Sequence, residues 1–405
     1  MCSDWKRENT TTLMKADVVV VFINIGHYHL TRINAAHKSI ATEGQSIVAL
    51  QVTHNTLRHP WGNRSPSPVP IITLDAATPH VSMAGEVPTV PTAHVFAQLD
   101  DLSPKVVLIP GWSFHICQQC LAWCRKRRVP AVLMSESKFD DEPRWLLKEW
   151  LKRLLHVRHF KAAIVGGEAH REYAISLGLP PDAVFTGYDV VDNGYFERAG
   201  DAARVSESAI RRDNPQIPPR PYFLSVTRLV ERKNIDGLIR GYANYVRFAG
   251  PTAWALVVCG DGPEMTTIRQ LVQAEQLADR VKLLGFLSYD VLPSWYAMAE
   301  CFVHSAHHEQ WGLVVNEACA SALPVIVGSK VGARYDLVGH GENGYLIDSR
   351  SVADIAAKLE QMAALPKDAR AEMGRRSRAR AGRLAPERFG AAVLAAIKVA
   401  TGGKS

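Results

Sequence analysis

Short apolar segments with strand character alternate with helical patterns along most of the chain. Because a parallel neighbour is reached only through a crossover, strands that each lead into a helix build parallel sheets. The pattern therefore predicts an α/β protein made of doubly wound, Rossmann-like sheets. In the first half we expect strands at 17–24, 46–53, 71–74, 105–110, 130–136, 162–166 and 183–187, and helices at 28–43, 114–128, 144–160 and 169–177.

The chain has 405 residues, enough for two domains of ordinary size. A charged, proline-rich segment at 198–219 interrupts the alternation, which restarts with the strand pattern YFLSVT. In open α/β sheets ligands bind at the carboxyl ends of strands, so the site is expected in a cleft where two domains face each other. The expected divisions are an N-terminal domain over 1–200, a linker over 201–219, a C-terminal domain over 220–382, and a final helix over 383–405 that packs back toward the N-terminal domain.

The composition indicates a folded protein of the cytoplasm. Apolar residues make up 47% of the chain and charged residues 21%, which excludes a disordered chain. We find no run of about 18 apolar residues, so no membrane span is expected, and MCSDWKRENTTTLMK lacks the order of a signal peptide. Seven cysteines, an odd number, favour reduced thiols. The net charge of +7 would suit anionic substrates or an anionic membrane surface, and it does not decide between them.

Three cysteines in HICQQCLAWCRKRR raise the question of a zinc site. Cys117, Cys120 and Cys124 share one side of the predicted helix, and His115 is nearby. No second pair of ligands follows at the spacing of zinc sites, so core packing is the preferred interpretation. We therefore expect no metal.

Two glutamates stand eight positions apart in HHEQWGLVVNEACA. Glu309 follows a strand pattern, and Glu317 lies inside an apolar helix pattern that opens at Gly312 and Leu313. A carboxylate on an apolar helix face is costly unless a partner binds it. A sugar attached to a nucleotide would offer hydroxyls to both glutamates.

Basic residues and glycines follow other strands of the second half. Arg228 and Lys233 come after YFLSVT, where an Arg fork and a Lys point charge could hold phosphates. A solvated basic turn is the alternative reading. Gly260 and Gly262 in GDGPE allow a tight turn and close ligand approach. Met265 stands where a dinucleotide fingerprint needs its third glycine, so nicotinamide binding is disfavoured.

At this point the second half resembles the retaining glycosyltransferases of family 4, which have the GT-B fold. The resemblance covers most of 222–348 and is carried by SVTRLVERKN, VVCGDGPE, LLGFLSYDVLPSWYAMAECFVHSA, HEQWGLVVNEACASALPVIVGS and ENGYLID. It implies transfer of a sugar from a nucleotide-diphosphate sugar to a hydroxyl acceptor with retention of anomeric configuration. The sugar nucleotide is then a co-substrate, with no resident cofactor and no metal.

The resemblance also implies roles for single residues. Glu309 would lie by the transferred sugar, and Glu317 would bind the ribose hydroxyls. Arg228 and Lys233 would hold the diphosphate and stabilise the leaving group. The remaining donor-binding positions would be Gly260, Gly262, Gly312, Leu313 and the backbone around Phe286, which would contact the base. The family arrangement assigns donor binding to the C-terminal domain and acceptor binding to the N-terminal domain.

The first half departs from the family pattern. The usual glycine pair after the first strand is reduced to Gly26, and Ser135 and Glu136 replace the histidine that many members have after PAVLM. The acceptor-side candidates are therefore Gly26, His27, His115 and Glu136. The acceptor itself could be a glycan, a lipid-linked glycan or a small molecule, and the sequence does not identify the base or the sugar.

The pattern RWLLKEWLKRLLHVRHF predicts a basic amphipathic helix. Such a helix can lie on an anionic membrane, which would put the protein at the inner membrane face, or it can pack on a sheet with a solvated polar side. The basic runs at 125–128 and 374–383 have no interleaved aromatics, so no nucleic-acid partner is expected.

Two other functions use the same scaffold. A sugar-nucleotide epimerase would isomerise the donor, and a non-catalytic protein would only bind it. The glutamate pair together with Arg228 and Lys233 favours transfer.

Overall fold

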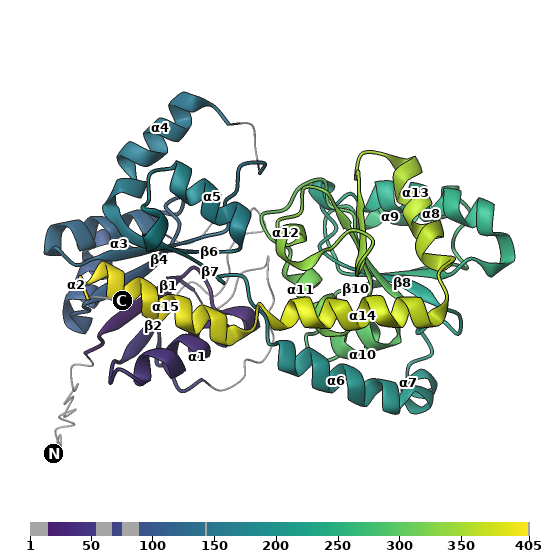
Figure 1. Ribbon diagram of the computed structural model, residues 1–405, viewed down its shortest axis with the longest axis horizontal. Helices are drawn as coiled ribbons and strands as arrows, with labels where there is room; N and C mark the ends of the chain where they lie inside the picture. Colours follow the sequence, from purple (N-terminus) through teal and green to yellow (C-terminus); the bar gives the residue numbers. More distant parts are fainter. Residues whose placement is uncertain (1–14, 54–66, 75–88, 142–143, 404–405) are drawn as a thin grey trace, which may run out of the picture.

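The computed structural model describes residues 15–53, 67–74, 89–141 and 144–403. They form two lobes side by side, each built on one parallel sheet (Figure 1). The doubly wound α/β architecture expected from the sequence is confirmed.

The N-terminal sheet has seven strands in the order β3-β2-β1-β4-β5-β6-β7, and all seven predicted strands are found. Its residues alternate between two cores: Val18 and Val20 face one side, and Val19 and Val21 face the other. The strands are β1 (Val18–Phe22), β2 (Ile47–Gln51), β3 (Ile71–Thr73), β4 (Val106–Pro110), β5 (Ala131–Ser135), β6 (Phe160–Val165) and β7 (Val184–Thr186).

Helices cover both faces of this sheet. The helix predicted over 144–160 is shorter than expected, because a 3₁₀ turn at Val157–His159 leads directly into β6. The helices of this half are α1 (His27–Ala41), α2 (Thr92–Leu102), α3 (His115–Arg127), α4 (Leu146–Leu155) and α5 (Glu168–Ser176), and α2 was missed from the sequence.

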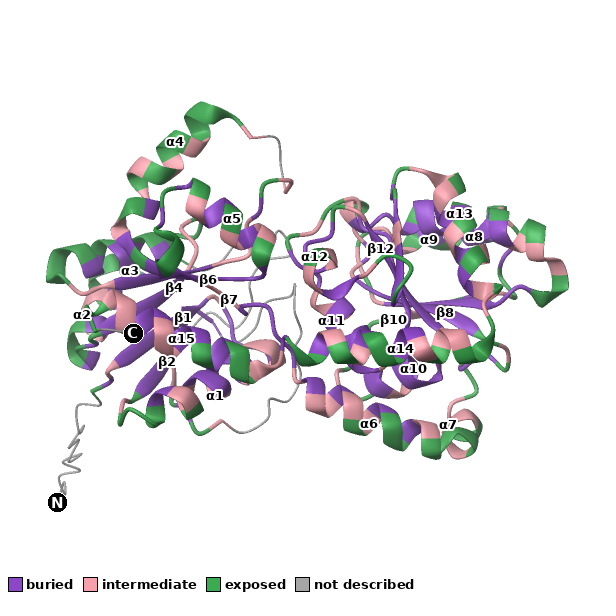
Figure 2. Cartoon of the chain, in the orientation of Figure 1, coloured by how far each residue is buried: buried purple, intermediate pink, exposed green. Residues whose placement is uncertain are grey.

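The C-terminal sheet has six strands in the order β10-β9-β8-β11-β12-β13. Its strands are β8 (Tyr222–Val226), β9 (Ala255–Cys259), β10 (Val281–Gly285), β11 (Cys301–His304), β12 (Val325–Gly328) and β13 (Gly344–Ile347). Its helices are α8 (Ile235–Ala249), α9 (Met265–Ala274), α10 (Leu292–Met298), α11 (Leu313–Ala320), α12 (Arg334–Leu337), α13 (Val352–Ala363) and α14 (Lys367–Gly382). Figure 2 shows the strands of both sheets buried and the outer faces of the helices exposed.

The chain passes between the lobes twice. The segment expected as a linker is largely helical: α6 (Asn193–Val205) and α7 (Glu207–Asp213) run through it, and α6 packs on α10 and α11. After α14 the chain continues into α15 (Pro386–Ala400), which packs on α1 and β6 of the N-terminal lobe (Figure 1). The chain therefore returns to the lobe in which it began.

The three cysteines of α3 are buried in the N-terminal core. Burial raises the pKa of the Cys117 and Cys124 thiols to about 12. Core packing, the preferred interpretation, is confirmed. No helix within the described ranges has both the length and the apolar character needed to cross a bilayer.

Candidate active site

The order of the C-terminal sheet places two loops side by side. Strand order reverses between β8 and β11, so the loops that leave their carboxyl ends flank the switch point, where ligands bind in open α/β sheets. Lys233 is in a 3₁₀ turn after β8, and Glu309 is in the loop after β11. The Lys233 ammonium contacts the Glu309 carboxylate, and Arg232 Nη1 lies 3.5 Å from the same carboxylate.

A buried histidine completes this ion cluster. His304, the last residue of β11, contacts the other oxygen of Glu309 through Nε2. Burial would raise the pKa of Glu309, but Lys233 and His304 outweigh it and hold this pKa well below its ordinary value. Burial also lowers the pKa of His304, against the pull of Glu309. At neutral pH the cluster therefore holds an ionised carboxylate beside a neutral imidazole.

Arg228 lies just beyond β8, close to this cluster. The pKa of Lys233 is lowered, first by burial and to a smaller degree by the positive charges of Arg232 and Arg228, against the pull of Glu309. The structure thus brings Arg228, Lys233 and Glu309 together at one edge of the sheet.

The start of α11 adds backbone donors beside Glu309. Gly312 caps this helix with φ 104°, and a Cβ there would lie 3.5 Å from Glu309 Oε2. Leu313 is the first helical residue. Since the first N–H groups of a helix lack partners within the helix, this end favours an anion.

Glycines allow the loop after β9 to lie directly against the loop after β8. A Cβ on Gly260 would lie 1.7 Å from the Thr227 carbonyl oxygen, and one on Gly262 would lie 2.3 Å from that of Leu229. Phe286, in the loop after β10, has 58% of its surface exposed. Apart from Glu317, which lies inside α11, the predicted donor-binding positions are on loops at the carboxyl edge or at the start of α11.

Glu317 has very different surroundings from Glu309. It is fully buried in α11, and its two oxygens accept hydrogen bonds from the hydroxyls of Tyr28 and Tyr296, the latter at 2.7 Å. Burial raises the pKa of Glu317 to about 7, although both tyrosines oppose the shift. Tyr28 belongs to α1 of the N-terminal lobe, so this hydrogen bond joins the lobes.

Because the pKa of Glu317 is raised, the stability of the folded protein should depend on pH. Glu317 keeps its proton in the folded state up to about pH 7, whereas the unfolded chain releases it near 4.5. The stability it contributes is therefore complete below pH 4.5 and is lost as the pH rises through 7. Glu317→Gln has no proton to lose, so its stability should not fall in this way. The free energy of unfolding of the variant minus that of wild type should therefore be larger at pH 8 than at pH 5, by on the order of 2 kcal/mol. Urea unfolding of both proteins measures this, and equal differences at the two pH values would contradict it.

The acceptor-side candidates are spread over the N-terminal lobe. Gly26 caps α1, and the ring of His27 stacks on Tyr289 of the C-terminal lobe at 4.5 Å, so His27 contributes to the contact between the lobes. His115 is exposed at the start of α3. Glu136 is half-buried directly after β5.

The structure also brings in residues that were not singled out from the sequence. Asp189 is fully buried and pairs with Arg32, Oδ1 to Nη2, at 3.0 Å. Its pKa is raised well above the ordinary value, first by burial and then by the charge of Glu136. An aspartate inside the apolar run GYDVV was the available signal for Asp189, and a histidine ending a buried strand was the signal for His304. The hydrogen bonds of Tyr28 and Tyr296 had no such signal.

The loop after β5 carries two carboxylates that bind one buried cation. Asp140 and Asp141 precede α4 in the sequence, where acidic residues often cap a helix, but α4 begins after Trp145 without any side-chain cap. Both carboxylates instead bind the buried ammonium of Lys138, at 2.7 and 3.0 Å. A buried ammonium needs such partners, because an unpaired buried charge is costly. Among the described residues, no group of three or more His, Cys, Asp or Glu is placed to hold a metal ion.

Sequence comparison gives a family match in the second half. The model of the family described as Glycosyl transferases group 1 matches residues 206–380. The GDP-mannose-dependent alpha-(1-6)-phosphatidylinositol monomannoside mannosyltransferase of Mycobacterium tuberculosis is 31% identical over 208 residues, 50% of this chain and 49% of that protein. The N-acetyl-alpha-D-glucosaminyl L-malate synthase of Bacillus anthracis is 29% identical over 187 residues, 45% and 46% of the two chains. The chain thus spans about half the length of the curated relatives it matches.

Structural comparison covers nearly the whole chain. A glycosyltransferase from Rickettsia africae superposes with TM-score 0.71 at 11% identity, over 95% of this chain and 98% of that one. Anabaena HepE, in complex with UDP and glucose, superposes with TM-score 0.69 at 16% identity, over 94% and 98%. At such identities the likeness shows a shared fold.

Proposed function

From the premise that the chain belongs, through residues 206–380, to the glycosyl transferases group 1 family and has the GT-B fold, we propose that it is a glycosyltransferase. It moves a sugar from a nucleotide-diphosphate sugar to an acceptor hydroxyl, with retention at the anomeric carbon. One observation supports this most: the cations after β8, the Glu309 carboxylate and the start of α11 meet at the switch point of the C-terminal sheet.

The cations neutralise the leaving group. As the bond between the anomeric carbon and the phosphate oxygen breaks, negative charge grows on the diphosphate. Arg228, Lys233 and the N–H groups at Gly312 and Leu313 are placed to stabilise that charge without reorganisation. The departing phosphate oxygen accepts the acceptor's hydroxyl proton while the acceptor oxygen attacks the same face. Glu309 holds hydroxyls of the transferred sugar throughout.

Donor binding requires Lys233 to exchange partners. Its ammonium is paired with Glu309 in this structure, and the side chain is only 7% exposed. An entering phosphate would take over this ammonium, which leaves Glu309 available to sugar hydroxyls. The ion pair therefore keeps both groups charged and oriented before the donor arrives.

Glu317 is assigned to the ribose hydroxyls, and the backbone around Phe286 to the base. Glu317 is fully buried with Tyr28 and Tyr296 against its two oxygens, so a ribose can reach it only if one tyrosine moves away. Tyr28 is the one on the opposite lobe, so separation of the lobes would release it.

Tyr28→Phe should therefore strengthen donor binding. The variant keeps the ring but removes the hydroxyl that competes with ribose, and one hydrogen bond of this kind is worth about 1 kcal/mol, a factor of about five in affinity. Calorimetric titration with the nucleoside diphosphate measures this. Weaker binding would instead mean that the Tyr28 hydroxyl contacts the donor.

The acceptor is assigned to the N-terminal domain, with the domain divisions expected from the sequence. Gly26, His27, His115 and Glu136 are the candidates on that side. Acceptors of the classes expected, a glycan, a lipid-linked glycan or a small molecule, all carry the hydroxyl that is needed. We place the protein in the cytoplasm, with peripheral contact at the inner membrane face.

Two measurements test this function in sequence. A thermal-shift screen of UDP-, GDP- and ADP-sugars identifies the donor, because a ligand that binds only the folded state raises the melting temperature. Release of nucleoside diphosphate is then followed with and without added acceptors. Acceptor-dependent release supports a transferase. Donor isomerisation without release would indicate an epimerase, and binding with neither would indicate a binding protein.

A further inference from the structure

Helix α4 shows its apolar side to solvent. It projects from the N-terminal lobe, and none of its ten residues is buried (Figures 1 and 2). Leu146 is 91% exposed and Trp150 is 56% exposed. The polar side chains of Glu149 and Lys152 are only 20% and 23% exposed. The burial of apolar and polar residues is therefore the reverse of that in an ordinary surface helix.

The polar side is fixed to the rest of the lobe. The Tyr173 hydroxyl of α5 donates to Glu149 at 2.6 Å, and Lys152 donates to Glu149 at 2.9 Å. Arg144, just before the helix, lies 3.6 Å from Glu149 and places its guanidinium over the Tyr173 ring. With these contacts facing inward, the opposite half of the helix faces outward. That half carries Leu146, Leu147, Trp150, Leu151 and Leu155, all exposed.

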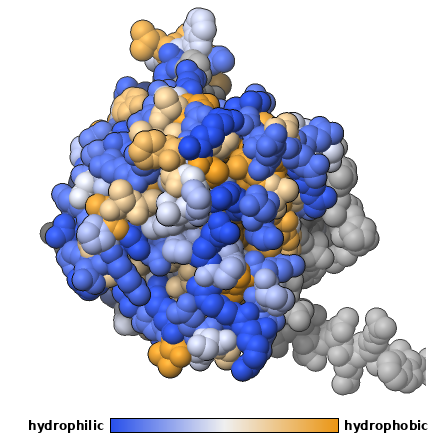
Figure 3. Space-filling model, turned by 90° about the vertical axis from the view of Figure 1, so that its right-hand side faces the viewer, coloured by the Kyte–Doolittle hydropathy of each residue, from blue (hydrophilic) through white to orange (hydrophobic). Residues whose placement is uncertain are grey.

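A patch of this kind marks an interaction surface, since water-exposed clusters of large apolar side chains are unusual on monomers. Figure 3 shows hydrophobic side chains on the segment that projects at the top of the molecule, which is α4 in Figure 1. Trp145, 66% exposed, lies at the start of the helix beside Leu146. Tryptophan with leucine is the combination that favours the boundary between lipid headgroups and acyl chains.

Positive charges surround the patch. Lys148 and Arg153 are exposed on the helix, and Arg158 is exposed just after it. After burial, the charges of Arg125 and Arg158 lower the pKa of His159, which places Arg125, from α3, near the end of α4. The only acid of α4, Glu149, is paired with Lys152. An occupant with negative charge around an apolar interior would complement this surface.

We propose that α4 docks on anionic bilayers, with its leucines and tryptophans at the headgroup boundary and the surrounding cations on acidic lipid. This names the surface and the lipid charge behind the peripheral membrane contact proposed above. It depends on no step of the transfer reaction.

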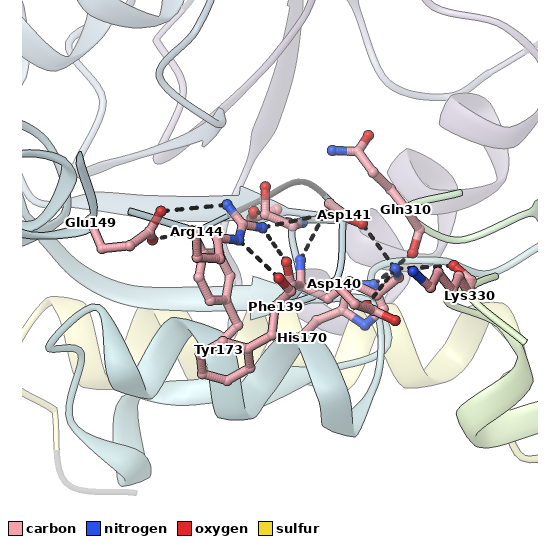
Figure 4. A network of polar contacts seen from close by, with 12 residues as sticks. Phe139, Asp140, Asp141, Arg144, Glu149, His170, Tyr173, Gln310 and Lys330 are labelled. Atoms are coloured by element: carbon pink, nitrogen blue, oxygen red, sulfur yellow. Dashed lines mark hydrogen bonds and ion pairs between the residues drawn. The ribbon is translucent and has the colours of Figure 1, made fainter. Parts of the chain in front are cut away.

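The base of α4 is linked to the contact between the lobes (Figure 4). Arg144 donates to the Phe139 carbonyl at 3.0 Å, in the loop whose Lys138 donates to the Lys330 carbonyl of the C-terminal lobe at 3.2 Å. His170 Nε2 lies 2.9 Å from the Gln310 carbonyl, next to Glu309. Docking through α4 would therefore hold the proposed active site in a defined position above the bilayer.

Vesicle flotation of the full chain tests this docking. The vesicles contain phosphatidylcholine alone or mixed with phosphatidylglycerol, at low and high salt. Wild type should float with the mixed vesicles and lose binding as salt rises. The double variant L146E/W150E should bind the mixed vesicles at least about tenfold more weakly, because it removes two inserted side chains and adds negative charge. The matched controls are Phe248→Glu and Val205→Glu, at positions 72% and 90% exposed on other helices, and both should bind as wild type does.

Three results would overturn the proposal. The first is wild-type protein that binds neither kind of vesicle. Another is a double variant that binds as tightly as wild type. A third is concentration-dependent self-association, measured by light scattering, that the double variant abolishes without any vesicle binding, since a second copy would then cover α4. Thermal shift by the sugar nucleotide is recorded on every variant, so that failure of donor binding is seen separately from failure of docking.

Discussion

Lys233→Ala should lower turnover by about 10²- to 10³-fold at saturating donor, the effect of losing one preorganised charge-stabilising donor. The residue is buried in contact with Glu309 at the switch point, where a leaving diphosphate would develop its charge. Arg228→Ala should produce a loss of similar size. Nucleoside diphosphate release under acceptor saturation measures both.

The control must separate catalysis from folding. Removing Lys233 alone takes the nearest cation from the largely buried Glu309 and leaves it Arg232, at 3.5 Å, and this loss can destabilise the protein by about 3–5 kcal/mol. The double variant K233M/E309Q replaces the ion pair with a neutral pair and should be more stable than Lys233→Ala while remaining inactive. The role of Lys233 would be refuted if any folded variant that lacks it kept turnover within about twofold of wild type. Losing a preorganised donor should lower turnover far more than that.

Gly260→Ala should destabilise the C-terminal domain by about 3–5 kcal/mol. The glycine has φ 138°, which side-chain-bearing residues rarely adopt, and its added Cβ would lie 1.7 Å from the Thr227 carbonyl oxygen. Backbone on both sides leaves no flexible atom to move away, so the β8 and β9 loops would have to separate. Urea unfolding measures the stability, and the sugar-nucleotide thermal shift should disappear with the loop contact.

Gly285→Ala is the matched control. This glycine also has positive φ, 73°, but a Cβ there meets no atom within 4 Å among the described residues. It should cost only about 1 kcal/mol, the penalty for the backbone conformation alone. Equal losses for the two variants would mean that the close approach of the β8 and β9 loops contributes nothing.

The sequence was sufficient for the two parallel sheets and for half of the candidate site, but it missed α2 and the helices of the expected linker. Periodicity predicts each strand because buried parallel strands read as short apolar runs, which is how all seven N-terminal strands were found. Strand ends then place side chains, since parallel strands share one carboxyl edge. Lys233 and Glu309, 76 positions apart, were each predicted to follow a strand, and the structure places them in contact at that edge.

The rest of the site depends on how the lobes are packed, and no local pattern encodes that. Glu317 and Tyr28 are 289 positions apart on different lobes. A carboxylate on an apolar face predicts that some partner exists, but not which one. The orientation of α4 was open for the same reason, because its pattern fits a helix that packs through either its apolar or its polar side. In the structure the polar side faces inward, where Glu149 accepts a hydrogen bond from Tyr173 of α5.

The most direct test of the central claim is a crystal structure with the nucleoside diphosphate identified by the thermal-shift screen. We predict the terminal phosphate within hydrogen-bonding distance of Lys233 and Arg228 at the start of α11, and the ribose at Glu317 with Tyr28 displaced. A diphosphate bound elsewhere, with Lys233 still held by Glu309, would contradict the account.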